Sequence, residues 1–97
     1  MKTIKNINTN ELASKVEKLK SIPLDTDEEG NNKIDNMIKN WKKVKEIPII
    51  LIKNNLQFEI IDGYHRIFTA LKLKEQKLKA IILDDFTVVR GIRRKIL

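Results

Sequence analysis

The sequence predicts a small α+β domain in which a mixed β-sheet carries about three helices. Short β-rich runs alternate with segments whose apolar residues recur at helical spacing, in the order β-α-α-β-β-α-β. The length of 97 residues fits one compact domain spanning 1–97. A hydrophobic fraction of 41%, with only three glycines and two prolines, suffices for a core and argues against global disorder.

The first part of the chain is expected to form one strand and two helices. "TIKNIN" (3–8) is typical of a short strand, and the following "NTNEL" offers Thr9 or Asn10 as a helix cap. We expect an amphipathic helix over 10–20 that ends at Ile22-Pro23, because apolar residues recur there at helical spacing: Leu12, Val16 and Leu19. A second apolar stripe predicts a helix over 32–44; it consists of Ile34, Met37, Ile38, Trp41 and Val44.

The second part is expected to form a hairpin, a helix and a further strand. Two β-rich runs, 47–53 and 56–61, are separated by Asn54-Asn55, which predicts a two-residue turn. Helical spacing resumes over 64–74, and "KLKAIIL" (77–83) predicts another strand. The core of the domain is therefore placed at 47–83, and the basic tail 86–97 is either a final strand or a loosely docked segment.

The positive charge is concentrated in the second half of the sequence. Residues 1–41 carry seven lysines and seven acids, whereas residues 42–97 carry thirteen Lys and Arg against six acids, giving the net +7. Such a balance indicates an anionic partner, either a nucleotide, a nucleic acid or an acidic surface. The alternative is that lysine serves only as a solubilising residue. The acidic stretch 25–29 is either a metal or amine site or solvated surface.

Several classes of protein are excluded. The chain has no cysteine, so disulfides, thiolate nucleophiles and cysteine-ligated metals are ruled out. No apolar run approaches the roughly 18–20 residues of a membrane span, and the N-terminus lacks the apolar stretch of a signal peptide. We therefore expect a cytoplasmic protein without a membrane partner, and the oligomeric state is left open.

The stretch "IIDGYHRIFTAL" (60–71) contains the candidate site at the join between a strand and a helix. Asp62 is expected to be the N-cap, and Gly63 permits a tight turn. His65 and Arg66 then lie in the first helical turn, where the helix dipole disfavours cations unless an anion binds beside them. The alternative is structural, with Asp62 only capping the helix and Arg66 pairing with an acid such as Glu59.

The segment "IPIILIKNNLQFEIIDGYHRIFTALKLKEQKLKAIIL" (47–83) resembles the core of the ParB/sulfiredoxin superfamily. Its Asp-Gly-Tyr-His-Arg turn is most similar to the Asp-Gly-His-His-Arg turn of the branch that phosphorylates free serine. The resemblance implies that a nucleotide (ATP, ADP or CTP with Mg²⁺) is bound through its phosphates by Gly63, Tyr64, His65 and Arg66. Asp62 is expected to orient a hydroxyl or Mg²⁺, because a carboxylate beside substrate phosphates is the usual magnesium arrangement. The resemblance also implies a catalytic carboxylate in the N-terminal region, for which Glu11 is the early candidate, and the catalytic candidates are therefore Asp62, His65 and Glu11.

The departures from the family leave three functions open. Tyr64 stands where sulfiredoxins have their reactive cysteine, so that chemistry is excluded, while a nucleotide-dependent kinase or hydrolase stays possible. The second hypothesis is a plasmid or phage partition or regulatory protein that binds DNA non-specifically through its basic half. Its candidate residues are Arg90, Arg93, Arg94 and Lys95. The third is a module that binds a protein partner and has lost its ligand.

Overall fold

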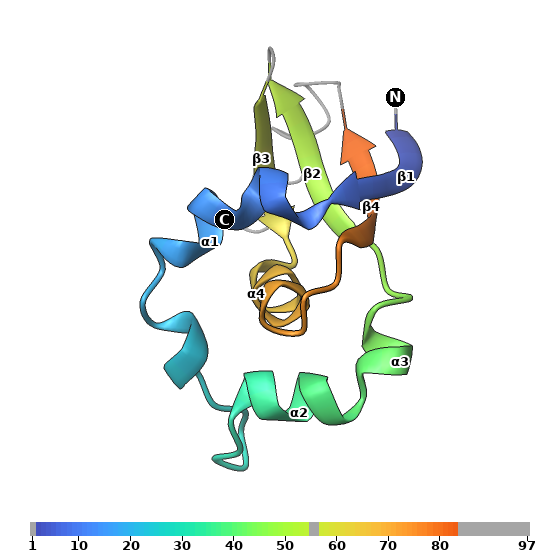
Figure 1. Ribbon diagram of the computed structural model, residues 1–97. Coiled ribbons are helices and arrows are strands. Elements are labelled where there is room, and N and C mark those ends of the chain that lie inside the picture. Colours follow the sequence, from blue (N-terminus) through green and yellow to red (C-terminus); the bar gives the residue numbers. More distant parts are fainter. Residues whose placement is uncertain (1, 55–56, 84–97) are drawn as a thin grey trace.

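The fold is that of a four-stranded mixed sheet with helices, as the computed structural model shows for residues 2–54 and 57–83 (Figure 1). The four strands are β1 (Lys2–Asn8), β2 (Ile49–Asn54), β3 (Gln57–Asp62) and β4 (Lys77–Leu83). The α-helices are α1 (Ala13–Glu17), α2 (Lys33–Lys39), α3 (Trp41–Val44) and α4 (Tyr64–Lys72). Two short 3-10 helices complete the described chain, η1 (Thr9–Leu12) and η2 (Ile22–Leu24).

The sheet has the strand order β1-β4-β2-β3. β4 pairs antiparallel with β1 on one side and parallel with β2 on the other, and β2 pairs antiparallel with β3. Parallel neighbours need a crossover, and α4 provides it between the β2–β3 hairpin and β4. The predicted α+β class and mixed sheet are therefore confirmed, as is the order of the elements.

Helix α4 lies at the centre of the helical part of the molecule. Figure 1 shows the chain from α1 through η2, α2 and α3 passing around it, and α4 contacts α1, α2, η1, η2 and β4. The residues of α4 that are buried among these neighbouring elements are Ile67, Thr69 and Ala70. The main core joins them to the inner face of the sheet, which contributes Ile7, Ile49, Leu51, Ile60, Leu78, Ala80 and Ile82.

The opposite face of the sheet is also apolar. Because side chains alternate along a strand, the residues next to the core positions point away from the helices. They form a second, smaller cluster that consists of Ile50, Ile52, Ile61, Ile81 and Leu83. A sheet that is apolar on both faces explains why residues 47–52 and 80–83 form continuous apolar runs.

Three predicted helix details are wrong. The helix expected over 32–44 is interrupted at Asn40, whose φ of −109° and ψ of 22° end α2 before α3 begins. The first helix begins as the 3-10 turn η1 and its regular part ends at Glu17. Its cap is Asn8, whose side chain accepts the Asn10 N–H, while Thr9 is buried and donates its hydroxyl to the Glu75 carbonyl at 2.7 Å.

Some predictions lie outside the described residues. These are the Asn54-Asn55 turn in part and the whole tail 86–97. No helix within residues 2–54 and 57–83 is long and apolar enough to cross a membrane.

Candidate functional site

Gly63 forms the join between β3 and α4. Its φ is +115°, a value that side-chain-bearing residues rarely adopt. A Cβ atom on Gly63 would also lie 2.5 Å from Cγ2 of Ile49, the first residue of β2. Both the backbone conformation and the close approach to β2 therefore require glycine, and they hold the start of α4 against the end of the sheet.

Among residues 2–54 and 57–83, no side chain caps the first turn of α4. The prediction that Asp62 is the N-cap is wrong, because Gly63 occupies that position and Asp62 is still the last residue of β3. The carboxylate of Asp62 instead accepts a hydrogen bond from Nη2 of Arg66, with Oδ2 at 3.1 Å. Within the described residues, the backbone N–H groups of Tyr64, His65 and Arg66 have no hydrogen-bond acceptor. The positive end of α4 is thus available to an external anion.

Arg66 ties α4 to the segment that leads into β2. Its Nη1 donates to the carbonyl oxygens of Ile47 at 3.1 Å and of Pro48 at 3.2 Å, in addition to the Asp62 contact. Only 11% of the side chain is exposed. The acid that it pairs with is therefore Asp62, four residues earlier, and not Glu59. Because its guanidinium is already satisfied, Arg66 is a positioning residue for the turn.

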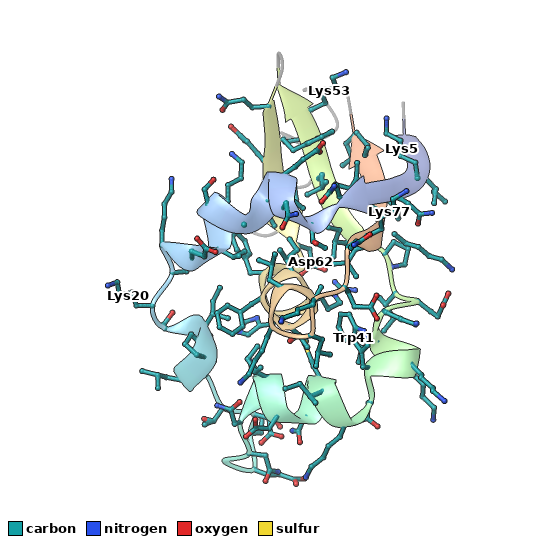
Figure 2. All side chains as sticks on the ribbon, in the orientation of Figure 1. Lys5, Lys20, Trp41, Lys53, Asp62 and Lys77 are labelled. Atoms are coloured by element: carbon teal, nitrogen blue, oxygen red, sulfur yellow. The ribbon has the colours of Figure 1, made fainter. Side chains whose placement is uncertain are left out.

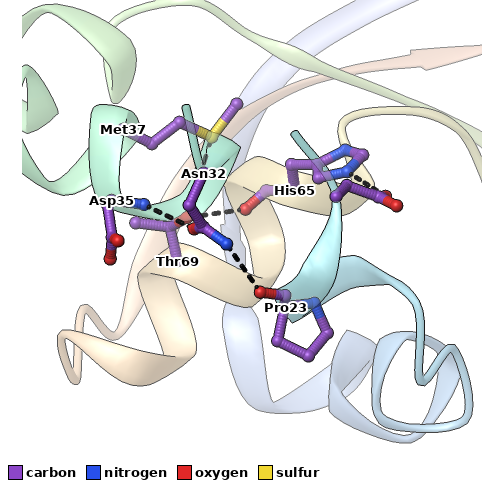
Figure 3. A network of polar contacts seen from close by, with 7 residues as sticks. Pro23, Asn32, Asp35, Met37, His65 and Thr69 are labelled. Carbon is purple, nitrogen blue, oxygen red and sulfur yellow. Dashed lines mark hydrogen bonds and ion pairs between the residues drawn. The ribbon is translucent and has the colours of Figure 1, made fainter. Parts of the chain in front are cut away.

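His65 is paired with Asp25, a residue that sequence reasoning did not assign to the site. The Nε2 atom of His65 lies 2.8 Å from Oδ2 of Asp25, and the side chains are 27% and 36% exposed. Figure 3 shows the His65 ring turned toward the segment that follows η2, while its carbonyl accepts the Thr69 hydroxyl at 2.8 Å. No local pattern links two residues forty positions apart, so the sequence held no signal for this pair.

The acidic stretch 25–29 is ordered by its own hydrogen bonds. Oδ1 of Asp27 accepts the N–H groups of Glu29 and Asn31, both at 2.9 Å, and Oδ2 accepts from the Asn36 side chain at 3.0 Å. The hydrogen bond from the Asn31 backbone is the main reason that the pKa of Asp27 is lowered below its ordinary value. Among the described residues, no group of three or more His, Cys, Asp or Glu side chains is arranged to hold a metal ion.

The start of α4 opens onto a pocket of about 280 Å³. The predicted residues Asp62, Gly63, Tyr64, His65 and Arg66 all line it, together with Met37 of α2. Tyr64 is also fixed, because its hydroxyl donates to the Ile60 carbonyl at 3.2 Å. The structure therefore brings the predicted binding residues together around one hollow.

The other predicted site residues lie elsewhere. Glu11 lines a separate hollow between α1 and the β2–β3 hairpin and is not part of the pocket at α4. The tail residues proposed for nucleic acid, Arg90, Arg93, Arg94 and Lys95, lie outside the described residues.

Comparisons with known proteins identify no protein similar to this chain. No protein-family model matches the sequence, and neither the curated proteins nor the solved structures contain a match. The resemblance to the ParB/sulfiredoxin superfamily therefore stays a prediction from the motif at 62–66 and the order of the elements.

Proposed function

We propose that this protein binds a nucleotide through its phosphate groups at the N-terminus of α4. The observation that carries the proposal is the uncapped first turn of a nine-residue helix facing a pocket. The N–H groups of such a turn, together with the helix dipole, form a ready site for phosphate oxygens. The Asp-Gly-Tyr-His-Arg motif supports a nucleotide as the source of the phosphate, by resemblance to a family that binds ATP, ADP or CTP.

The surroundings support a rigid site. Gly63 is held against Ile49, Arg66 is bonded to the carbonyls of residues 47 and 48, and His65 is held by Asp25. Donors fixed in this way lose little conformational freedom when a ligand binds. The backbone N–H groups and the wall residue His65 are therefore the parts of the site that contact phosphate in this proposal.

In this proposal, Asp62 is the residue that would hold the magnesium ion bound with the nucleotide. Its carboxylate lines the pocket with the side chain 65% exposed, and it would repel a bare phosphate there. Magnesium is commonly held by one or two carboxylates together with substrate phosphates, which fits a single acid better than a dedicated metal cluster. Asp62 and His65 are also the pocket residues that can accept a proton, so a phosphoryl transfer to a hydroxyl would use one of them.

The test is a thermal-shift experiment with ATP, ADP, CTP and GTP, each with and without Mg²⁺. A ligand that binds the native state raises the melting temperature, so at least one nucleotide should stabilise the wild-type protein. Two variants isolate charge at the site. Tyr64→Glu places a carboxylate in the first turn of α4, whereas Tyr64→Gln removes the same aromatic ring and adds no charge.

The proposal expects the Gln variant to keep a nucleotide-dependent shift and the Glu variant to lose it. The Glu variant supplies its own anion to the helix N-terminus and repels phosphate. The absence of any shift in the wild-type protein, or equal shifts in the two variants, would overturn the proposal.

A further inference from the structure

A second hollow, larger than the pocket at α4, lies between α1 and the β2–β3 hairpin. Its volume is about 640 Å³, and its walls are formed by Glu11, Ser14, Lys15, Lys18, Lys53, Gln57 and Phe58. Figure 1 shows the chain that leads from β1 through η1 into α1 crossing in front of β3, and Figure 2 shows Lys53 on the upper part of the hairpin. Two segments that are distant in sequence therefore form this hollow together.

The hollow is basic although two of its three lysines come from the electrically neutral part of the sequence. Lys15 and Lys18 belong to residues 1–41, which carry equal numbers of lysines and acids, and folding places them beside Lys53 of β2. Three lysines face one acid, Glu11, in these walls. Among the described residues, no acidic side chain forms an ion pair with any of the three lysines. Their charge is therefore available to an anionic ligand.

A third hollow joins the basic one to the pocket at α4. It measures about 260 Å³ and is lined by Lys15, Lys18, Glu59, Ile60 and Tyr64. It shares both lysines with the larger hollow and Tyr64 with the pocket at α4. The three hollows thus adjoin in a row, from Lys53 across Tyr64 to the uncapped turn. The walls of the row also hold three acids, Glu11, Glu59 and Asp62, of which Asp62 is paired with Arg66. We refer to this row as the basic groove, because its lysines are concentrated at the end beside the hairpin.

We infer that the basic groove binds a short single-stranded nucleic acid. A mononucleotide at α4 would occupy only one end of the row, whereas a strand would place successive phosphates along Lys18, Lys15 and Lys53. Aromatic walls alongside a line of cations are the combination that single-strand-binding proteins use, and Phe58 and Tyr64 are half-buried in these walls. The inference rests on the proposed phosphate site for one end of the strand.

The experiment measures fluorescence anisotropy of labelled oligothymidylates, from the mononucleotide to twelve residues, over a range of salt concentrations. The affinity of the full chain should rise with length over the first few nucleotides, roughly four, and then level off. The variant Lys15→Gln/Lys18→Gln/Lys53→Gln should bind the longer strands at least about tenfold more weakly. It should also reduce the slope of log K against log salt by roughly 2, since each lost phosphate contact in a single strand contributes about 0.7.

A charge-matched control separates the groove from the overall charge. Lys39→Gln/Lys42→Gln/Lys43→Gln removes three exposed lysines of α2 and α3, which line none of the three hollows. It should keep both the affinity and the salt slope. Equal losses in the two triple variants would overturn the inference, as would competition by oligoglutamate as strong as that by a strand of equal charge.

The outcome also distinguishes the two proposals. Mononucleotide binding without any gain from longer strands would overturn the groove and leave the phosphate site at α4 standing. Strand binding that needs the three groove lysines, together with mononucleotide binding that survives their loss, would support both. Failure of every ligand to bind would overturn both.

Discussion

At the scale of single residues, Gly63 determines the geometry of the site more than the charged residues beside it. The two basic side chains that attracted attention in the sequence are both engaged in the fold, Arg66 with Asp62 and His65 with Asp25. Among the described residues, the backbone N–H groups of the first turn of α4 have no acceptor. The positive φ at Gly63 that places them there is one that residues with a side chain rarely adopt. In the proposed site, the main-chain N–H groups and His65 therefore contact phosphate, while the side chains of Tyr64 and Arg66 serve as walls and supports.

Replacement of Gly63 by alanine should destabilise the protein by about 2–4 kcal/mol. A side chain there would have to adopt a positive φ and would also overlap Ile49, and each effect costs one to a few kcal/mol by rough estimate. Urea denaturation measures the change in the free energy of unfolding. Gly30→Ala is the matched control: its φ is +87°, but nothing lies within 4 Å of the added Cβ. It should cost about 1 kcal/mol, and equal losses would contradict the role of Ile49.

Asp27 should make the stability of the protein dependent on acid pH. Its pKa is lowered in the folded state from an ordinary value of 3.8, chiefly by hydrogen bonds from the 29–31 backbone. The stabilisation is therefore present above that ordinary value and is lost as the pH falls through the lowered pKa. The free energy of unfolding should be larger for the wild-type protein than for Asp27→Asn near neutral pH, and the difference should shrink as the pH falls below the ordinary value of 3.8. A difference that is constant with pH would contradict this assignment.

At the scale of elements, the sequence predicted the strands and helix ends that are determined by patterns of neighbouring residues. Strand 77–83, the start of the helix at Tyr64 and the hairpin strands were visible because their patterns repeat within a few residues. The break at Asn40 was not visible, because the apolar stripe continues through it to Trp41 and Val44. Trp41 is anchored by a hydrogen bond from its Nε1 to Oε1 of Glu75 at 3.0 Å, across 34 residues (Figure 2).

The same limit applies to the candidate site. The turn 62–66 was recognisable because its motif is contiguous, and all five of its residues line one pocket. Asp25 and the lysines of the basic groove were not recognisable, since only the tertiary fold brings Asp25 to His65 and Lys53 to Lys15. The capping role assigned to Asp62 failed because one further residue, Gly63, separates it from the helix.

The C-terminal end of α4 offers a stabilising substitution. Lys74 has a φ of +60° just beyond the helix, in the left-handed conformation that glycine adopts at little cost. Lys74→Gly should therefore raise the free energy of unfolding by about 0.5–1 kcal/mol. The comparison is Lys72→Gly, at the last residue of α4, which should lower it by about 1 kcal/mol. Chemical denaturation measures both, and changes of the same sign would contradict the assigned backbone conformation.

At the scale of the whole molecule, stability depends on the core between the sheet and the helices. Leu51 is fully buried in the central strand β2, whereas Ile4 on the edge strand β1 is 64% exposed. Leu51→Ala should cost about 3 kcal/mol because it leaves a cavity, and Ile4→Ala less than about 0.5 kcal/mol. Urea midpoints of the two variants provide the measurement. Similar losses would mean that the edge strand is buried against a partner.

The distribution of charge is also a property of the whole molecule. Summed along the sequence, the first 41 residues contribute no net charge, which directs attention to the second half. Folding places charged residues of the first half at different sites: Asp25 contacts His65 of α4, whereas Lys15 and Lys18 line the hollow beside the hairpin together with Glu11. A count of charges along the chain therefore could not locate the basic groove.

The position of β4 has a consequence for synthesis of the protein. β4 pairs with β1 on one side and with β2 on the other, yet it is the latest of the four described strands to leave the ribosome. Until it emerges, the N-terminal strand has no neighbour in the sheet and the hairpin has an open edge where the parallel partner belongs. In the nascent chain, the apolar strands β1, β2 and β3 therefore stay exposed until the central strand β4 has been synthesised. Chaperones that shield such strands should matter most for translation of the segment between residues 50 and 83.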